Sequence, residues 1–235
     1  MPILTPQALD RLPVAAVELQ SGDCLCQPEF HERYLQIHTD QKIELVEGRV
    51  VMSSPVRQPH SSRHFLLMTL LGQYATQTVG VEGGIDATLV LDEFNEPQPD
   101  AFLRVLPECG GQTRPYAGEY IAGGPEWVGE IAYSSISTDL HDKKVAYLRN
   151  GVREYFVFDV KSQLIHYFQT AEGLSVSPDR EGIYRSTAMP GLWIDGPAFI
   201  SHDSTRLLQT LQRGLASSEH QDFVERLAQQ RLVND

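Results

Sequence analysis

Residues 126–160, EWVGEIAYSSISTDLHDKKVAYLRNGVREYFVFDV, contain the pattern that decides the fold. The run at 126–133 predicts a strand, residues 138–150 predict a helix, and the apolar run at 152–160 predicts a strand buried on both faces. Gly151 follows the helix at the position where a left-handed residue commonly ends one. A strand, a helix and a strand in this order predict a parallel crossover.

Shorter elements precede this unit. Two apolar runs flank Glu47-Gly48 and predict a β-hairpin over residues 42–52. Residues 60–78 predict a helix, residues 80–92 alternate in polarity like a strand, and residues 99–105 predict a further short strand. The apolar stripe of the helix is expected to contain Phe65, Leu66, Thr69, Leu70 and Tyr74.

The flanking segments are less regular. Residues 106–125 are rich in glycine and polar side chains, which predicts a loop. After the crossover, residues 164–169 predict a strand that pairs with the one before it. Residues 205–213 predict a helix that Gly214 ends, and a capping-box pattern opens a last helix over 218–232.

The element order predicts an α/β fold with a mixed β-sheet flanked by helices and a C-terminal helical extension. We divide the chain into an N-terminal arm at 1–30, a core domain at 31–170 and an extension at 171–235. The extension is expected to pack on the core and to end in two helices.

Composition bounds the class of protein. An apolar fraction of 41% is enough for a core, and no apolar run approaches the roughly 20 residues of a membrane helix. Because three cysteines are sparse and no signal peptide is evident, we expect a cytoplasmic protein with no membrane partner. The spacing of Cys24 and Cys26, with His31 and His38 nearby, is a weak zinc pattern without a second cysteine pair.

The net charge of −12 argues against nucleic-acid binding through the overall charge of the chain. A local basic cluster or a bound metal ion would offset it. Four basic residues could form such a cluster or be scattered solvated charges: Arg57, Arg63, Arg104 and Lys144.

Three residues carry the chemistry that the chain could perform. Asp100 in QPD at 98–100 and Glu130 in EIA at 130–132 lie on strands expected to be neighbours, so they could hold a divalent metal ion. Lys143 follows on the helix and could serve a phosphate or a water molecule. Other roles stay open: Asp100 could be a turn residue, and Lys143 could lie on a solvated helix face beside its partner Asp139.

The motifs occur in a fixed order along about residues 30–200: IELVEG at 43–48, QPDAF at 98–102, EIA at 130–132, DLHDK at 139–143, GVREY at 151–155 and PGLW at 190–193. This set resembles the bacterial Uma-type family of restriction endonucleases, within the PD-(D/E)XK restriction-endonuclease-like superfamily. The resemblance implies a restriction-endonuclease-like core.

The resemblance also implies roles for single residues. Asp100 and Glu130 would bind Mg²⁺ or Mn²⁺, with the Ile131 carbonyl as a further ligand. The superfamily pattern has a lysine where this chain has Ala132, and Lys143 on the helix would take its place.

Two further residues are candidate catalytic groups. Glu44 would complete the carboxylate cluster, and His60 would contact a phosphate or protonate the leaving oxygen. The sequence therefore predicts a metal-dependent endonuclease that acts on nucleic acid, in the first place DNA. The alternative is an inactive nuclease-fold binding module. A homodimer would suit the cutting of two strands, but no feature of the sequence demonstrates it.

Overall fold

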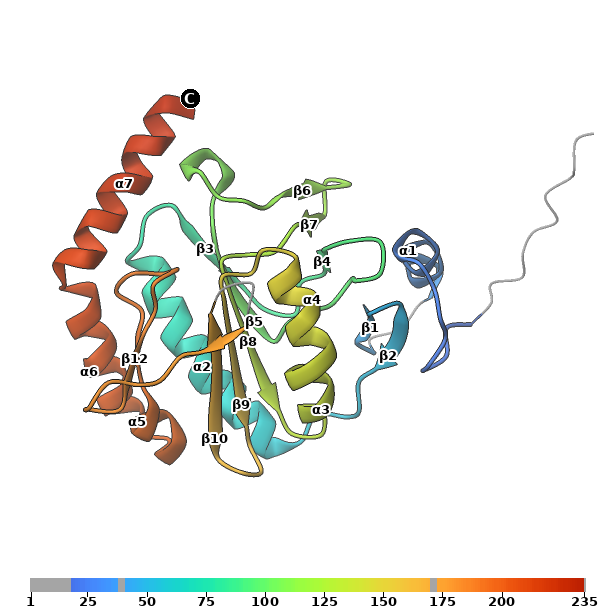
Figure 1. Cartoon of the computed structure of the whole chain (residues 1–235), viewed down its shortest axis with the longest axis horizontal. Coiled ribbons are helices and arrows are strands. Elements are labelled where there is room, and N and C mark those ends of the chain that lie inside the picture. The colour runs from blue at the N-terminus through green and yellow to red at the C-terminus, as the bar shows by residue number, and fades with distance from the viewer. Residues whose placement is uncertain (1–17, 38–40, 170–172, 235) are drawn as a thin grey trace, which may run out of the picture.

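The computed structural model describes residues 18–37, 41–169 and 173–234. Figure 1 shows a central sheet with helices on both faces. Its strand order is β11-β10-β9-β8-β5-β3, in which β8 and β9 are parallel and the other neighbours are antiparallel. The expected α/β fold with a mixed sheet is confirmed. The strands are β3 (Val81–Gly84), β5 (Ala101–Val105), β8 (Trp127–Ala132), β9 (Glu154–Asp159), β10 (Leu164–Gln169) and β11 (Leu174–Ser175).

The predicted parallel crossover joins β8 to β9 and is also confirmed. Its helical segment begins at Ile136, two residues before the predicted start, and continues to Arg149. Gly151 follows with a φ of 88°, the left-handed value that its position requires. Inside the segment lies a π-helical turn, a feature that often marks functional sites. The parts are α3 (Ile136–Thr138), the turn η2 (Asp139–Lys143) and α4 (Lys144–Arg149).

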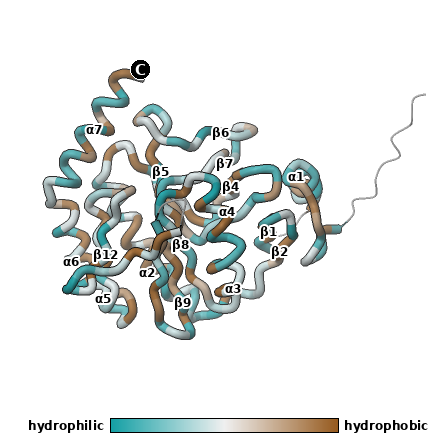
Figure 2. The backbone as a smooth tube through the Cα atoms, viewed as in Figure 1, coloured by the Kyte–Doolittle hydropathy of each residue, from teal (hydrophilic) through white to brown (hydrophobic). Residues whose placement is uncertain are grey.

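Side chains from the two faces of the sheet belong to separate apolar clusters, because they alternate in direction along each strand. In β5, Ala101 and Leu103 belong to one cluster and Phe102 belongs to the other. The C-terminal helices and α2 cover the first face, α4 covers the second, and Figure 2 shows apolar segments on the central strands. The helices of the first face are α2 (Gln58–Thr76), α5 (Gly196–Ser201), α6 (Ser204–Leu215) and α7 (Ser218–Asn234).

The buried face of α2 differs from the predicted stripe. Phe65 is 75% exposed, whereas Leu67 and Leu71 are fully buried. Apolar residues occupy adjacent positions on this helix, so periodicity alone did not fix the face, and packing against β8 and α6 decided it. Neither α2 nor any other helix in the described ranges is both long enough and apolar enough to cross a membrane.

The strand predicted over 80–92 is wrong in extent. It divides into β3 and the separate β4 (Leu89–Val90), since Asp86 adopts a φ of 49° and turns the chain between them. The predicted loop at 106–125 is more regular than expected, because two short strands within it form a small sheet with β4. Its other elements are η1 (Pro107–Cys109), β6 (Arg114–Tyr116) and β7 (Tyr120–Ala122).

The predicted hairpin is confirmed as β1 (Ile43–Val46) and β2 (Arg49–Met52). Its turn residues Glu47 and Gly48 both have positive φ, which matches the twist of a two-residue hairpin. The helix α1 (Gln27–Gln36) packs here, and Leu19 and Phe30 are buried against the hairpin. Residues 1–17 of the predicted arm lie outside the described residues.

Gly214 does not end its helix as predicted but lies inside α6. A Cβ at this position would lie 2.2 Å from the carbonyl oxygen of Gly191 and 2.7 Å from the Trp193 ring. Glycine is therefore needed for the close approach of α6 to the hairpin of β12 (Ile183–Arg185) and β13 (Trp193–Asp195).

This packing gives a stability prediction. Gly214→Ala should lower the free energy of unfolding by about 1–3 kcal/mol, because the added methyl group overpacks the contact. Gly72→Ala, in the exposed middle of α2 where a Cβ meets nothing within 4 Å, should raise it by up to about 1 kcal/mol. Urea denaturation of both variants checks the pair, and equal effects would contradict the assigned role of Gly214.

Candidate active site

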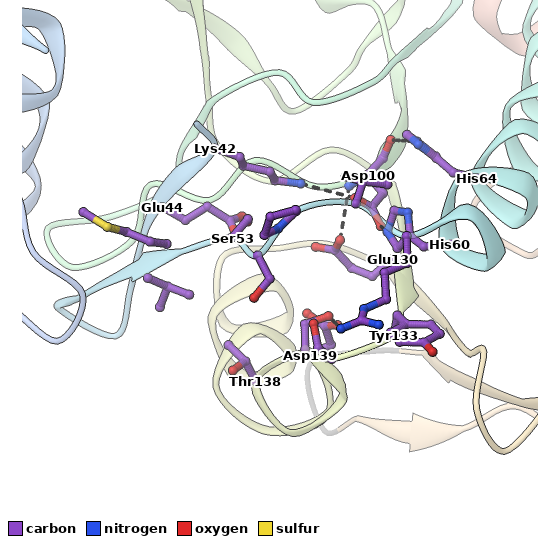
Figure 3. Close-up of a pocket in the computed structure, with 18 of the residues that line it drawn as sticks. Lys42, Glu44, Ser53, His60, His64, Asp100, Glu130, Tyr133, Thr138 and Asp139 are labelled. Atoms are coloured by element: carbon purple, nitrogen blue, oxygen red, sulfur yellow. Dashed lines mark hydrogen bonds and ion pairs between the residues drawn. The ribbon is translucent and has the colours of Figure 1, made fainter. Parts of the chain in front are cut away.

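All five predicted site residues line one cleft of about 740 Å³: Glu44, His60, Asp100, Glu130 and Lys143. The hairpin, the first turns of α2, the ends of β5 and β8, and η2 form its walls. Figure 3 shows Glu130 beside Asp100, with His60 and His64 approaching from α2. The fold thus brings together residues that are up to 99 positions apart in the chain.

The register of β5 against β8 places the two carboxylates side by side. Ala101 is opposite Gly129, so Asp100 comes opposite Glu130 at the next position. The Asp100 N–H donates to Glu130 Oε2 at 3.2 Å, and the Ile131 N–H donates to Asp100 Oδ2 at 2.8 Å. Because backbone groups hold both side chains, their relative position is fixed by the sheet itself.

Lys143 reaches the carboxylates from η2 and is only 4% exposed. Its Nζ lies 2.8 Å from Glu44 Oε1, 3.1 Å from Glu130 Oε1 and 3.9 Å from Asp139 Oδ1. Ala132, where the superfamily pattern has its lysine, is fully buried in the cluster beneath α4. It lies two residues after Glu130 and so shares its face of β8, the face on which Lys143 arrives from the helix.

Two contacts of Asp100 were not predicted. Lys42 Nζ lies 3.2 Å from Asp100 Oδ1, and His64 Nε2 lies 2.7 Å from the Asp100 carbonyl oxygen. Spacing alone could have suggested both. Lys42 is two residues before Glu44 at the start of an extended hairpin strand, and His64 is one helical turn after His60.

Burial and neighbouring charges separate the pKa values of the carboxyls. Burial raises the pKa of Glu130 to about 8, aided by Asp100 and Asp139 and opposed by Lys143. Burial likewise raises the pKa of Asp139 to about 6. For Asp100, burial is outweighed by the His60 hydrogen bond and the charge of Lys42, which hold its pKa below the ordinary value.

For the two lysines, the charges of neighbouring acids outweigh the effect of burial on the pKa. Burial would lower the pKa of Lys143, but the charges of Glu130, Glu44 and Asp139 raise it well above its ordinary value. The pKa of Lys42 is also raised, because Glu44 and Asp100 outweigh its burial. Both side chains therefore stay protonated at neutral pH.

The charge of this site fits a divalent cation. Five carboxyls line the cleft near two lysines: Glu44, Asp86, Asp100, Glu130 and Asp139. Burial and the neighbouring acids disfavour the charged form of Glu130, and a cation at the site would favour it. Within the described ranges, no three His, Cys, Asp or Glu side chains form a group suited to a metal ion. Mg²⁺ does not require one, because it commonly binds through one or two carboxylates and keeps several waters. Asp100 and Glu130 satisfy that requirement.

Most residues of the weaker sequence patterns lie outside the cleft. Cys24 accepts a hydrogen bond from Arg49, and His31 contacts the buried Glu96, so the structure offers no support for zinc at this segment among the described residues. His38 lies outside the described residues. Of the four basic residues considered for a rim, Arg104 pairs with Glu82 and Lys144 lies over the Phe168 ring. Arg57 lines the cleft.

Comparison with known proteins shows the family of the chain. The family model described as "Uma2: Putative restriction endonuclease" matches residues 28–196. The chain belongs to this family. No curated protein matches it. Asp100, Glu130 and Lys143 all fall within the part of the chain that the Uma2 model matches.

A solved structure shows the same fold. It is the crystal structure of a "putative nuclease belonging to DUF820" from Anabaena variabilis ATCC 29413. The two chains are 13% identical, the match covers 83% of this chain and 97% of that chain, and the TM-score is 0.54. The nuclease-like fold expected for a Uma2 protein is confirmed.

The raised pKa of Glu130 predicts how the stability of this Uma2 protein depends on pH. Folded Glu130 keeps its proton up to about pH 8, whereas the unfolded chain loses it near 4.5. The free energy of unfolding should therefore fall as pH rises between these values. Glu130→Gln has no such proton to lose, so the variant should gain on wild type over this range, by on the order of 2 kcal/mol.

Urea denaturation in EDTA at pH 5, 6.5 and 8 measures this gain. Asp139→Asn is the matched comparison, because its gain should be complete near pH 6. A constant difference between Glu130→Gln and wild type at all three pH values would contradict the assignment of a buried, charge-strained Glu130.

Proposed function

We propose that this protein is a divalent-metal-dependent endonuclease that hydrolyses phosphodiester bonds, with DNA as its substrate. The observation that carries the proposal is the pair Asp100 and Glu130, held side by side in a cleft with a buried lysine. Membership of the Uma2 family and the nuclease-like fold support it. A cytoplasmic location and a homodimer stay predictions.

Asp100 and Glu130, with the Ile131 carbonyl, would hold Mg²⁺ or Mn²⁺. When bound, the ion would supply positive charge at the phosphate and lower the pKa of a water molecule. Lys143 would stabilise the negative charge that develops on the phosphate, since its raised pKa keeps it protonated and unsuited to act as a base. Glu44 would fix the Lys143 ammonium in place through their 2.8 Å contact.

His60 is the candidate for proton transfer to the leaving oxygen. Its Nε2 lies 3.2 Å from Asp100 Oδ2, which orients the ring. Its Nδ1 is buried without a hydrogen-bond partner among the described residues. A buried ring nitrogen without a partner is costly, and because His60 lines the cleft, a rotation of the ring that exposes Nδ1 would let a substrate oxygen satisfy it.

A second candidate function is a nucleic-acid-binding module that does not cut. The contacts of Asp100 favour it, because Lys42 and His60 already engage its two oxygens. Such a module would bind DNA equally well with and without a divalent cation and would show no turnover.

Substitution of Asp100 tests the endonuclease. Asp100→Asn should reduce the rate of plasmid and single-stranded DNA cleavage in Mg²⁺ or Mn²⁺ by at least about 100-fold, because it removes charge where the cation would bind. Glu154→Gln is the matched control. Glu154 is also buried, but it lies on β9 outside the cleft, where it accepts a hydrogen bond from the Tyr167 hydroxyl. Its cleavage rate should stay near that of wild type. Equal cutting by Asp100→Asn and wild type would refute this assignment of the site.

A further inference from the structure

A second depression, of about 450 Å³, adjoins the candidate active site. Tyr133 lines both cavities, so the two lie next to each other at this side chain. The charged character changes across that ring. The active-site cleft is rich in carboxyls, whereas no Asp or Glu is among the described residues that line the second depression, and Arg63, Lys161 and His202 are.

Two cations gather around Tyr133. The Arg57 guanidinium carbon lies 5.6 Å from the centre of the Tyr133 ring, and Lys161 Nζ lies 5.0 Å from it. Neither side chain has a carboxylate partner in the part of the chain that the structure describes. Arg57 and Lys161 are both exposed and are therefore available to a ligand.

Another pair of cations that share a ring is neutralised by acids. Arg185 and Arg213 both lie over the Trp193 ring, and they form ion pairs with Asp179 and Glu181. In a chain of net charge −12, Arg57 in the cleft and Lys161 in the second depression, neither with a carboxylate partner among the described residues, make a local site for an anion.

The floor of the depression is also electropositive. Arg63 is held there by hydrogen bonds from its guanidinium to the carbonyl oxygens of Phe199, at 2.6 Å, and Ile200, at 2.8 Å. The α2 helix begins at Gln58 on the same wall, with no acidic residue in its first turn and no side-chain cap. Its N-terminal dipole adds to the positive potential of the fixed guanidinium.

We propose that Arg57 and Lys161, with His202 at the edge, bind the backbone phosphates that flank the cut position on a nucleic-acid strand. The proposal rests on the nucleic-acid substrate of the proposed function. A strand whose scissile phosphate lies at Asp100 and Glu130 would continue past Tyr133 into the second depression. Contacts to phosphates of this kind position a strand without selecting its sequence.

The salt dependence of binding tests these contacts. Lys161→Gln should make the slope of log affinity against log salt less negative, by about 0.9 for duplex DNA or about 0.7 for a single strand. This is the contribution of one phosphate contact in each case. In the double variant, Arg57→Gln with Lys161→Gln, the change in slope should be about twice as large. Fluorescence anisotropy with labelled 20-nucleotide probes in EDTA measures both slopes and needs no cleavage.

Lys144→Gln is the matched control. Lys144 also lies over an aromatic ring, 4.5 Å from the centre of Phe168, but it lines neither cavity. Its slope should equal that of wild type. Equal slopes for Lys161→Gln and wild type, equal losses at Lys161 and Lys144, or no binding of either probe by wild type would each overturn the proposal.

The same experiment separates this proposal from the endonuclease. If wild type does not cut DNA, but Lys161→Gln lowers the salt dependence of binding and Lys144→Gln does not, the phosphate site is supported and the endonuclease is refuted. If Asp100→Asn abolishes cutting, but substitution of Arg57 and Lys161 leaves the salt dependence of binding unchanged, the endonuclease is supported and the phosphate site is refuted.

Discussion

The contacts of Lys143 with Glu44 and Glu130 are the interaction on which the site depends. The lysine comes from the crossover helix, one acid from the hairpin and the other from the central sheet, so these contacts join three parts of the fold. An ion pair this deeply buried is a weak source of stability, because removing both charges from water costs about as much as their attraction returns. Its value lies instead in the fixed arrangement of charge that it imposes on the cleft.

The sequence predicted the central elements because their signals are local. Alternation, a glycine after the helix and an apolar last strand define the crossover, and the order of the motifs identified Asp100, Glu130 and Lys143 before their distances were known. Features that depend on contacts between distant segments of the chain could not be predicted in this way. The face of α2 depends on what packs against Leu67 and Leu71, and the division of the 80–92 segment depends on β4 pairing with a distant strand. Gly214 looked like a helix end because its packing partner, Gly191, is remote in sequence.

The acidic charge of the chain and a nucleic-acid substrate are compatible in this structure. Carboxyls are concentrated where a cation would bind, and two cations without a carboxylate partner in the described part of the chain lie around the Tyr133 ring. A divalent ion and a small number of lysine and arginine contacts would replace the broad basic surface of many DNA-binding proteins. The helix α2 serves both regions, since its first turns carry His60 toward the carboxyls and Gln58 toward the second depression.

The central claim is that Asp100 and Glu130 together hold a divalent cation. Isothermal titration of Mn²⁺ into metal-free wild type and Glu130→Gln at pH 8 tests it most directly. The account predicts saturable binding at one site per chain in wild type, lost in Glu130→Gln although the variant remains folded. Binding of equal affinity in both proteins, or no specific binding in wild type, would contradict it and would leave the two carboxyls as structural groups.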